Sequence, residues 1–360
     1  GATGKSALAK YISTRLNSPI LALAIPKAVG EDSFDGLLVN SYGFSEAGKV
    51  IEKMNAGNYS VIIESIDEGR LKTSEEALSA FFANIASIAK VSQGVSFILF
   101  GRYQSLESLW LSFSDSDVDA ALLEIQVFTK DQAIDFIDKQ VLSDQTASIA
   151  ISQRRNEYEK ARDFIVTSLG RFFDLSGDNL NTVNEKFMGY APVLLAISEL
   201  LKKEHNYHKL LEELATQNYF EKEIDLVINI LQRILSREKN EKIVEKYIPS
   251  LLQKMNESER SIALDKAYSH EEQCVRLIQN INSSKNYYKV FESEDLQLAY
   301  EEGITVWLKD HPFTQNGVFQ NVVFEAYCLC VLLCTDDSKY YEDAIEYISN
   351  NKYKNNQLLF

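Results

Sequence analysis

Short apolar runs alternate with longer stretches of helical periodicity over roughly the first 140 residues of the chain. Four of these runs predict strands, at residues 19–28, 60–64, 95–100 and 122–128. Strands that alternate with helices are typical of a parallel sheet, because the chain must cross back between neighbouring strands. This part of the chain is therefore predicted to fold as an α/β domain.

Two helices of this region are marked by their apolar faces. Within residues 74–89 the apolar positions recur every three or four residues, and Ser74, followed by Glu75 and Glu76, suits the start of a helix. Residues 130–142 predict a second amphipathic helix.

Beyond about residue 145 helical periodicity dominates. It runs through residues 155–169, 192–202, 207–214 and 225–255. Residues 283–309 show weaker helical periodicity, and we expect them to contain the strands of a winged-helix unit. The pattern thus predicts an α/β domain over 1–144, an α-helical lid domain over 145–255 and a winged-helix-like or helical domain over 256–360.

Composition narrows the classes of function. The chain has a net charge of −15, whereas proteins that bind nucleic acids in general have a basic surface. We therefore expect no direct nucleic-acid binding by this chain. No run of about 18 apolar residues appears, so we expect no membrane-spanning segment.

The sequence around the cysteines predicts that their side chains are buried in the core. Three of them, Cys328, Cys330 and Cys334, lie in an apolar helical run, and Cys274 stands apart. Free cysteine there behaves as a small buried hydrophobe, and the histidines show no spacing that matches a metal site. We predict core positions for these cysteines and a reducing, cytoplasmic setting.

The first residues carry the most specific motif. Gly1-Ala2-Thr3-Gly4-Lys5-Ser6 runs into a predicted helix and matches the second half of the phosphate-binding loop G-x-x-x-x-G-K-[ST]. We expect Gly4 to turn backbone N–H groups towards a phosphate, Lys5 to reach the β- and γ-phosphates, and Ser6 to offer its hydroxyl to Mg²⁺. The predicted nucleotide contacts of the loop are Gly1, Thr3, Gly4, Lys5, Ser6 and Ala7. Because the loop's first glycine is missing, we expect the natural protein to extend further towards the N-terminus.

Acidic residues and an arginine follow two later strands. The run at 60–64 ends in Glu64, with Asp67 and Glu68 close behind, and Arg102 follows the run at 95–100. Carboxylates at a strand end suit a nucleotide-bound Mg²⁺ and the activation of the attacking water. An arginine leaving a neighbouring strand can sense the γ-phosphate.

In this order the residues resemble the STAND class of P-loop NTPases, and its NACHT branch most. The resemblance rests on Lys5-Ser6, on Val61-Ile62-Ile63-Glu64-Ser65-Ile66-Asp67-Glu68 and on Phe100-Gly101-Arg102. Residues 127–133 are similar to the family's entry into the helix after the fifth strand. Residues 189–195 resemble its G-x-P-L motif, which implies that Pro192 approaches the base or ribose. Residues 319–327 resemble its winged-helix signature, where Asn321 occupies the position of a histidine that touches the β-phosphate of ADP.

The chain also departs from the family pattern. The strand-end acid is usually Asp, whereas here it is Glu64. Either Glu64 orders the Mg²⁺ shell, or Asp67 takes the metal side with Glu68 as base. We favour Glu64 for the metal and Asp67 for water activation, with Glu68 as second candidate. Asn321 can donate a hydrogen bond but carries no charge.

The resemblance implies a regulated ATPase switch that binds ATP or ADP with Mg²⁺. It further implies a homo-oligomer on activation, flanking effector and sensor domains, and a setting in anti-phage defence or stress signalling. The alternatives are a STAND-type transcription regulator, a small-molecule kinase and a nucleotide-bound scaffold that does not hydrolyse.

Overall fold

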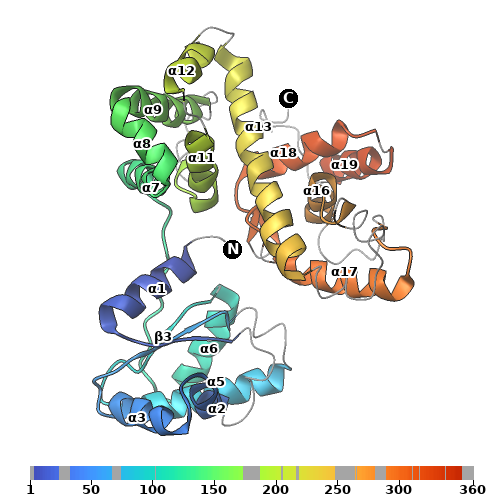
Figure 1. Cartoon of the computed structure of the whole chain (residues 1–360). Helices are drawn as coiled ribbons and strands as arrows, with labels where there is room; N and C mark the ends of the chain where they lie inside the picture. The colour runs from blue at the N-terminus through green and yellow to red at the C-terminus, as the bar shows by residue number, and fades with distance from the viewer. Residues whose placement is uncertain are drawn as a thin grey trace. The chain divides into compact units, whose positions relative to one another are not determined.

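A computed structural model describes most of the chain (Figure 1). The described residues are 4–23, 33–66, 74–101, 103–172, 187–203, 206–215, 219–247, 264, 266–279, 289–309, 311–315, 317–336 and 338–350. They divide into two compact units, Gly4–Gln126 and a second unit that begins at Val127. The finer division into three domains stays a prediction.

The smaller unit is built on a three-stranded parallel sheet in the order β1–β2–β3. Its strands are β1 (Ile20–Ala22), β2 (Val61–Glu64) and β3 (Phe97–Leu99). Three of the predicted strands are therefore confirmed, each shorter than its apolar run where the structure describes it. The chain is an α/β fold in this unit and helical in the rest.

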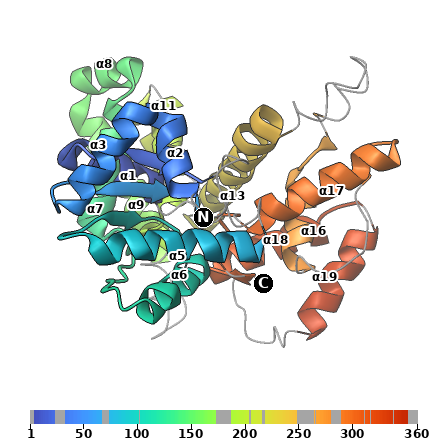
Figure 2. The ribbon, with the colours of Figure 1, turned by 90° about the horizontal axis from the view of Figure 1, so that it is seen from below.

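Helices cover both faces of this sheet. On one face lie α2 (Ser33–Tyr42), α3 (Phe44–Asn55), α5 (Glu75–Val91) and α6 (Tyr103–Asp115). The opposite face is covered by α1 (Lys5–Leu16), which packs on β1 and β2 (Figure 1). Figure 2 shows α5 and α6 side by side. The helix predicted at 74–89 is confirmed as α5, and Ser74 accepts a hydrogen bond from the N–H of Ala77 at its start.

Strand alternation decides which side chains face α1. Val61 and Ile63 are buried in the core that β2 shares with α2, α3, α5 and α6. Because successive side chains of a strand point to opposite faces, Ile62 and Glu64 project towards the α1 side. Ile62 is fully buried there.

The strand predicted at 122–128 is wrong. These residues have no regular secondary structure, and the side chains of Leu122, Leu123, Ile125 and Val127 are exposed. A strand forms only when its backbone pairs with a neighbouring strand, and this segment pairs with none of the described strands. The segment ends instead where the N–H of Phe128 bonds to the carbonyl of Gly189.

The second unit is helical in nearly all its described residues. Its helices are α7 (Lys130–Leu142), α8 (Gln145–Gln153), α9 (Arg155–Phe172), α11 (Ala191–Lys203), α12 (Tyr207–Ala215), α13 (Tyr219–Arg237), the π-helix η1 (Glu238–Tyr247), α16 (His270–Ile278), α17 (Glu294–Lys309), α18 (Val322–Leu333) and α19 (Ser338–Asn350). The predicted helices are confirmed at α7, α9, α11 and α12. The helix predicted over 225–255 is confirmed as α13, but it changes to a π-helix after Arg237, and residues 248–255 lie outside the described residues.

Winged-helix strands at 283–309 are not found where the structure describes this stretch. Residues 289–293 are irregular and α17 follows, because Tyr300, Ile304 and Leu308 recur every four residues and are buried together. Residues 283–288 lie outside the described residues. A two-stranded antiparallel ribbon occurs later, between β4 (Thr314–Gln315) and β5 (Val318–Phe319).

A buried polar cluster holds α16 and α17 together. Glu272, which has no exposed surface, accepts hydrogen bonds from the backbone N–H of Tyr268 at 2.7 Å, the hydroxyl of Tyr300 at 2.8 Å and the Nε of Arg276 at 2.8 Å. Arg276 also donates to both carboxylate oxygens of Glu301, at 2.6 and 2.8 Å. The polar groups of the cluster thus satisfy one another inside an apolar core.

The cysteines only partly match their prediction. Cys274 and Cys328 are buried, Cys330 is half-buried and Cys334 is exposed. The core prediction is wrong for Cys334, which lies just past the last residue of α18 and so no longer on its packed face.

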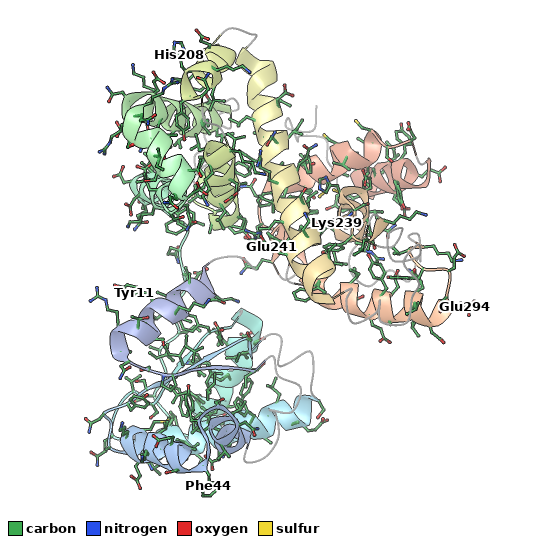
Figure 3. The ribbon with its side chains drawn as sticks, in the orientation of Figure 1. Tyr11, Phe44, His208, Lys239, Glu241 and Glu294 are labelled. Carbon is green, nitrogen blue, oxygen red and sulfur yellow. The ribbon has the colours of Figure 1, made fainter. Side chains whose placement is uncertain are left out.

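Surface positions of α1 and α12 are shown in Figure 3. Tyr11 lies on the exposed side of α1, where the Arg15 guanidinium carbon is 5.4 Å from the ring centroid. His208 is exposed on α12 with its Nδ1 3.5 Å from Glu212. His205 lies outside the described residues.

One histidine of the second unit carries a pH prediction. The Nε2 of His270 lies 3.0 Å from the hydroxyl of Ser236. Burial lowers the pKa of His270 from its ordinary value of 6.5; Glu271 opposes this shift and Lys239 adds to it. The folded state therefore binds a proton less readily than the unfolded state, and stability present above pH 6.5 is lost as the pH falls through the lowered pKa.

We expect His270→Gln, which keeps a partner for Ser236, to unfold with less pH dependence between about pH 7.5 and about 5.5 than the wild type. Urea unfolding at several pH values measures this. An unchanged slope of stability against pH would show that His270 does not carry the effect.

Candidate functional site

The N-terminal turn of α1 has the chemistry of an anion site. Gly4 precedes the helix with φ 87° and ψ 11°, a left-handed conformation that glycine adopts without strain. Gly4, the residue before the helix, has no side chain that could cap this helix end, and the first turn holds no acidic residue. Ser6 and Ala7 are exposed. Because the first N–H groups of a helix have no carbonyl partner within it, they can donate to a bound phosphate.

Topology brings this turn to the same edge of the sheet as Glu64. Only residues 17–19 join α1 to β1, so α1 runs back along the strand and begins at its carboxyl end. β1 and β2 are parallel, with Ala22 opposite Glu64 at their ends. Glu64 also projects to the α1 face. The helix start and the carboxylate therefore share one edge and one face of the sheet, where parallel α/β folds bind their ligands.

Glu64 has an unpaired oxygen at this edge. Its Oε2 is buried, and none of the described residues donates a hydrogen bond to it. The backbone of Glu64 is held in place, since its carbonyl accepts from the N–H of Leu23 at 3.0 Å. A buried carboxylate oxygen without a partner costs free energy unless a proton or a cation satisfies it. The donor set, one carboxylate and a nearby hydroxyl, fits a Mg²⁺ ion that takes its remaining ligands from phosphate and water.

Several predicted site residues cannot be placed. Gly1, Thr3, Asp67, Glu68 and Arg102 lie outside the described residues. The strand ends that precede them are described: Glu64 closes β2, and Gly101 follows β3 by two residues. From the order of α1, β1 and β2 we infer that Gly4–Ala7 and Glu64 lie at one edge of the sheet. The nucleotide contacts of these residues and the choice among Glu64, Asp67 and Glu68 stay predictions.

Pro192 and Asn321 have structural roles in the second unit. Pro192 is buried in the first turn of α11, where proline is well tolerated. Asn321 caps α18: its Oδ1 accepts from the N–H of Val323 at 2.9 Å, and the residue is 7% exposed. Asparagine is a preferred residue at this position of a helix. Nucleotide contacts by these two residues stay predictions.

Sequence reasoning missed two residues at the edge of the sheet. Ser65 has φ 62°, a left-handed conformation that is uncommon outside glycine. Gly101 lies so close to its neighbours that a β-carbon there would be 3.2 Å from Leu106 and 3.5 Å from Ile66. A serine gives no signal of a left-handed backbone, whereas glycine at position 101 is the residue type that permits such a close approach.

Two other features are not found among the described residues: a metal site made of side chains alone and a membrane-spanning helix. In the part of the chain that the structure describes, no three His, Cys, Asp or Glu side chains gather so as to hold a metal ion by themselves. Among the described helices, none combines the length and apolar character needed to cross a membrane.

No family model, curated protein or solved structure matches this chain.

Proposed function

We propose that the unit Gly4–Gln126 binds a nucleoside triphosphate with Mg²⁺ at the carboxyl edge of its sheet. The observation that carries the proposal is the coincidence of two chemistries there. The start of α1, where Gly4 offers no capping side chain and the first turn holds no acid, is inferred to lie at the same edge as a carboxylate whose buried oxygen has no partner among the described residues. The first suits phosphate and the second suits its cation.

Each residue then has a role. The N–H groups of the first turn of α1 hold the phosphates, Lys5 neutralises the β- and γ-phosphates, and Ser6 and Glu64 hold Mg²⁺. A Mg²⁺ ion held by Ser6 and Glu64 would supply positive charge to the phosphates. Asp67, with Glu68 as the second candidate, orients and deprotonates the attacking water, and Arg102 senses the γ-phosphate.

We further propose that the nucleotide is ATP, hydrolysed slowly, and that the chain is a switch. ATP would favour an open form that assembles with copies of itself and activates a flanking effector, and ADP a closed one, in antiviral defence or stress signalling. The sequence motifs support this finer function, and the helical unit that follows the α/β unit is of the kind that such a switch requires.

A glutamate substitution tests the metal side of the site. Glu64→Gln removes a charge whose buried oxygen has no described partner, so we expect the nucleotide-free protein to gain about 1 kcal/mol, or about 4 °C in Tm. We also expect it to lose most of the extra stabilisation that Mg²⁺ adds to ATP. Thermal unfolding with ATP plus Mg²⁺ and with ATP plus a chelator measures both effects.

The control is Glu52→Gln, which changes an exposed glutamate on α3 of the same unit. It should behave as the wild type. A Glu64→Gln protein that is less stable without nucleotide, and that keeps the full Mg²⁺ response, would contradict the assignment of Glu64.

A further inference from the structure

The alternation of β2 breaks directly after Glu64. In a regular strand, Ile66 would follow Ile62 and Glu64 on the α1 face. Ile66 is instead fully buried in the opposite core, together with Val61 and Ile63. It lies next to the carboxyl end of β3, since a β-carbon placed on Gly101 would be 3.5 Å from its own.

The residue at the break is Ser65. Its φ of 62° is left-handed, and a non-glycine residue pays about 1–2 kcal/mol to adopt that conformation. This turn of the backbone is what returns Ile66 to the core after Glu64 has projected to the other face. Ile63 and Ile66 thus anchor the chain on both sides of Glu64, one on β2 and the other past the turn.

Two neighbouring residues are therefore unfavourable for the folded state: the backbone of Ser65 is strained, and a buried oxygen of Glu64 has no partner among the described residues. Such costs persist only where the surrounding packing imposes them, and they cluster at functional sites. We propose that Ser65 is a positioning residue, whose left-handed backbone fixes the Glu64 carboxylate where it binds the cation of the nucleotide. This inference rests on the proposed function and adds to it a residue that acts only through Glu64.

The serine side chain is not what the proposal requires. Glycine adopts the left-handed conformation freely, so Ser65→Gly should keep the position of Glu64. A β-branched residue resists that conformation, so Ser65→Val should move the chain between Ile63 and Ile66. The two substitutions therefore separate the backbone geometry from the hydroxyl.

The experiment follows thermal unfolding of the full chain against Mg²⁺ concentration, at a fixed concentration of a hydrolysis-resistant ATP analogue. For Ser65→Val we expect the Mg²⁺ concentration at half-maximal thermal stabilisation to rise about tenfold. Backbone strain of this kind can produce an effect of that size. For Ser65→Gly we expect a change of less than about twofold. In a Glu64→Gln background, Ser65→Val should remove no further Mg²⁺ response, because Ser65 acts through Glu64.

Asp117→Val is the matched control for strain. Asp117 has φ 60° in the same unit, is exposed, and follows α6. This variant should lose stability as Ser65→Val does, and yet keep the wild-type Mg²⁺ dependence.

The outcomes separate the two claims. A wild type that responds to Mg²⁺ and a Ser65→Val protein with the same Mg²⁺ dependence would overturn the role of Ser65 and leave the nucleotide site standing. The role of Ser65 would also be overturned if Ser65→Val weakened the Mg²⁺ response equally in the wild-type and the Glu64→Gln backgrounds. A wild type with no response to the analogue and Mg²⁺ would overturn the nucleotide site and this inference with it.

Discussion

Replacing Arg276 with methionine is expected to destabilise the helical unit by about 3–5 kcal/mol. Glu272 is completely buried, and burial raises its pKa while Arg276 and the hydrogen bonds of Tyr300 and Tyr268 oppose that rise. Without Arg276 the carboxylate keeps its two other donors but loses the only charge that compensates it among its described hydrogen-bond partners. Glu301 loses its guanidinium partner at the same time and keeps the hydrogen bond from the Gln297 amide.

Tryptophan fluorescence during urea unfolding measures this. The chain has two tryptophans, Trp110 in the α/β unit and Trp307 on α17, so a Trp110→Phe background leaves a single reporter beside the cluster. The matched control is Arg155→Met, which breaks an exposed pair with Glu159 and should cost less than about 1 kcal/mol. Equal small losses in the two variants would show that the buried cluster does not stabilise this unit.

Replacing Lys5 with alanine is expected to weaken nucleotide binding at least about a hundredfold, since a charged partner of the phosphates is lost. Lys5 occupies the first turn of α1, directly after the left-handed Gly4. The backbone N–H groups remain in the variant, so the loss isolates the side chain. Calorimetric titration with ATP and Mg²⁺ gives the affinity.

Lys10→Ala is the control for this variant. Lys10 is exposed on the same helix, more than one turn away, so its removal changes the net charge equally. It should bind as the wild type does. If the two lysine variants bind alike, Lys5 is not a phosphate ligand.

Local signals explain which elements could be predicted. The bounds of α7 were predicted to the residue, because Thr129 and Gln132 form a capping box at its start and the apolar face defines the rest. The strands β1 to β3 were found because both their faces are covered, which leaves continuous apolar runs. The run at 122–128 is interrupted by Glu124 and Gln126. Whether such a run becomes a strand depends on pairing with a neighbouring strand, which local sequence does not reveal.

The residues of the candidate site could likewise be predicted only in part from local sequence. Gly4, Lys5, Ser6 and Glu64 are predicted from residue type and spacing, and the order of α1, β1 and β2 is compatible with a common edge of the sheet; their roles stay predictions. The left-handed Ser65 could not be predicted, because the conformation follows from where Ile66 packs. The capping role of Asn321 was readable in principle, since asparagine directly before an apolar helix is a common start signal.

The most direct test of the nucleotide site is the number of nucleotides bound per chain. Nucleotide released by denaturing the purified full chain is identified by chromatography, and equilibrium dialysis with ATP and Mg²⁺ gives what the remaining sites take up. We predict a total of about one adenine nucleotide per chain in the wild type and almost none in Lys5→Ala. A wild type that neither releases nucleotide nor binds it at millimolar concentration would contradict the account.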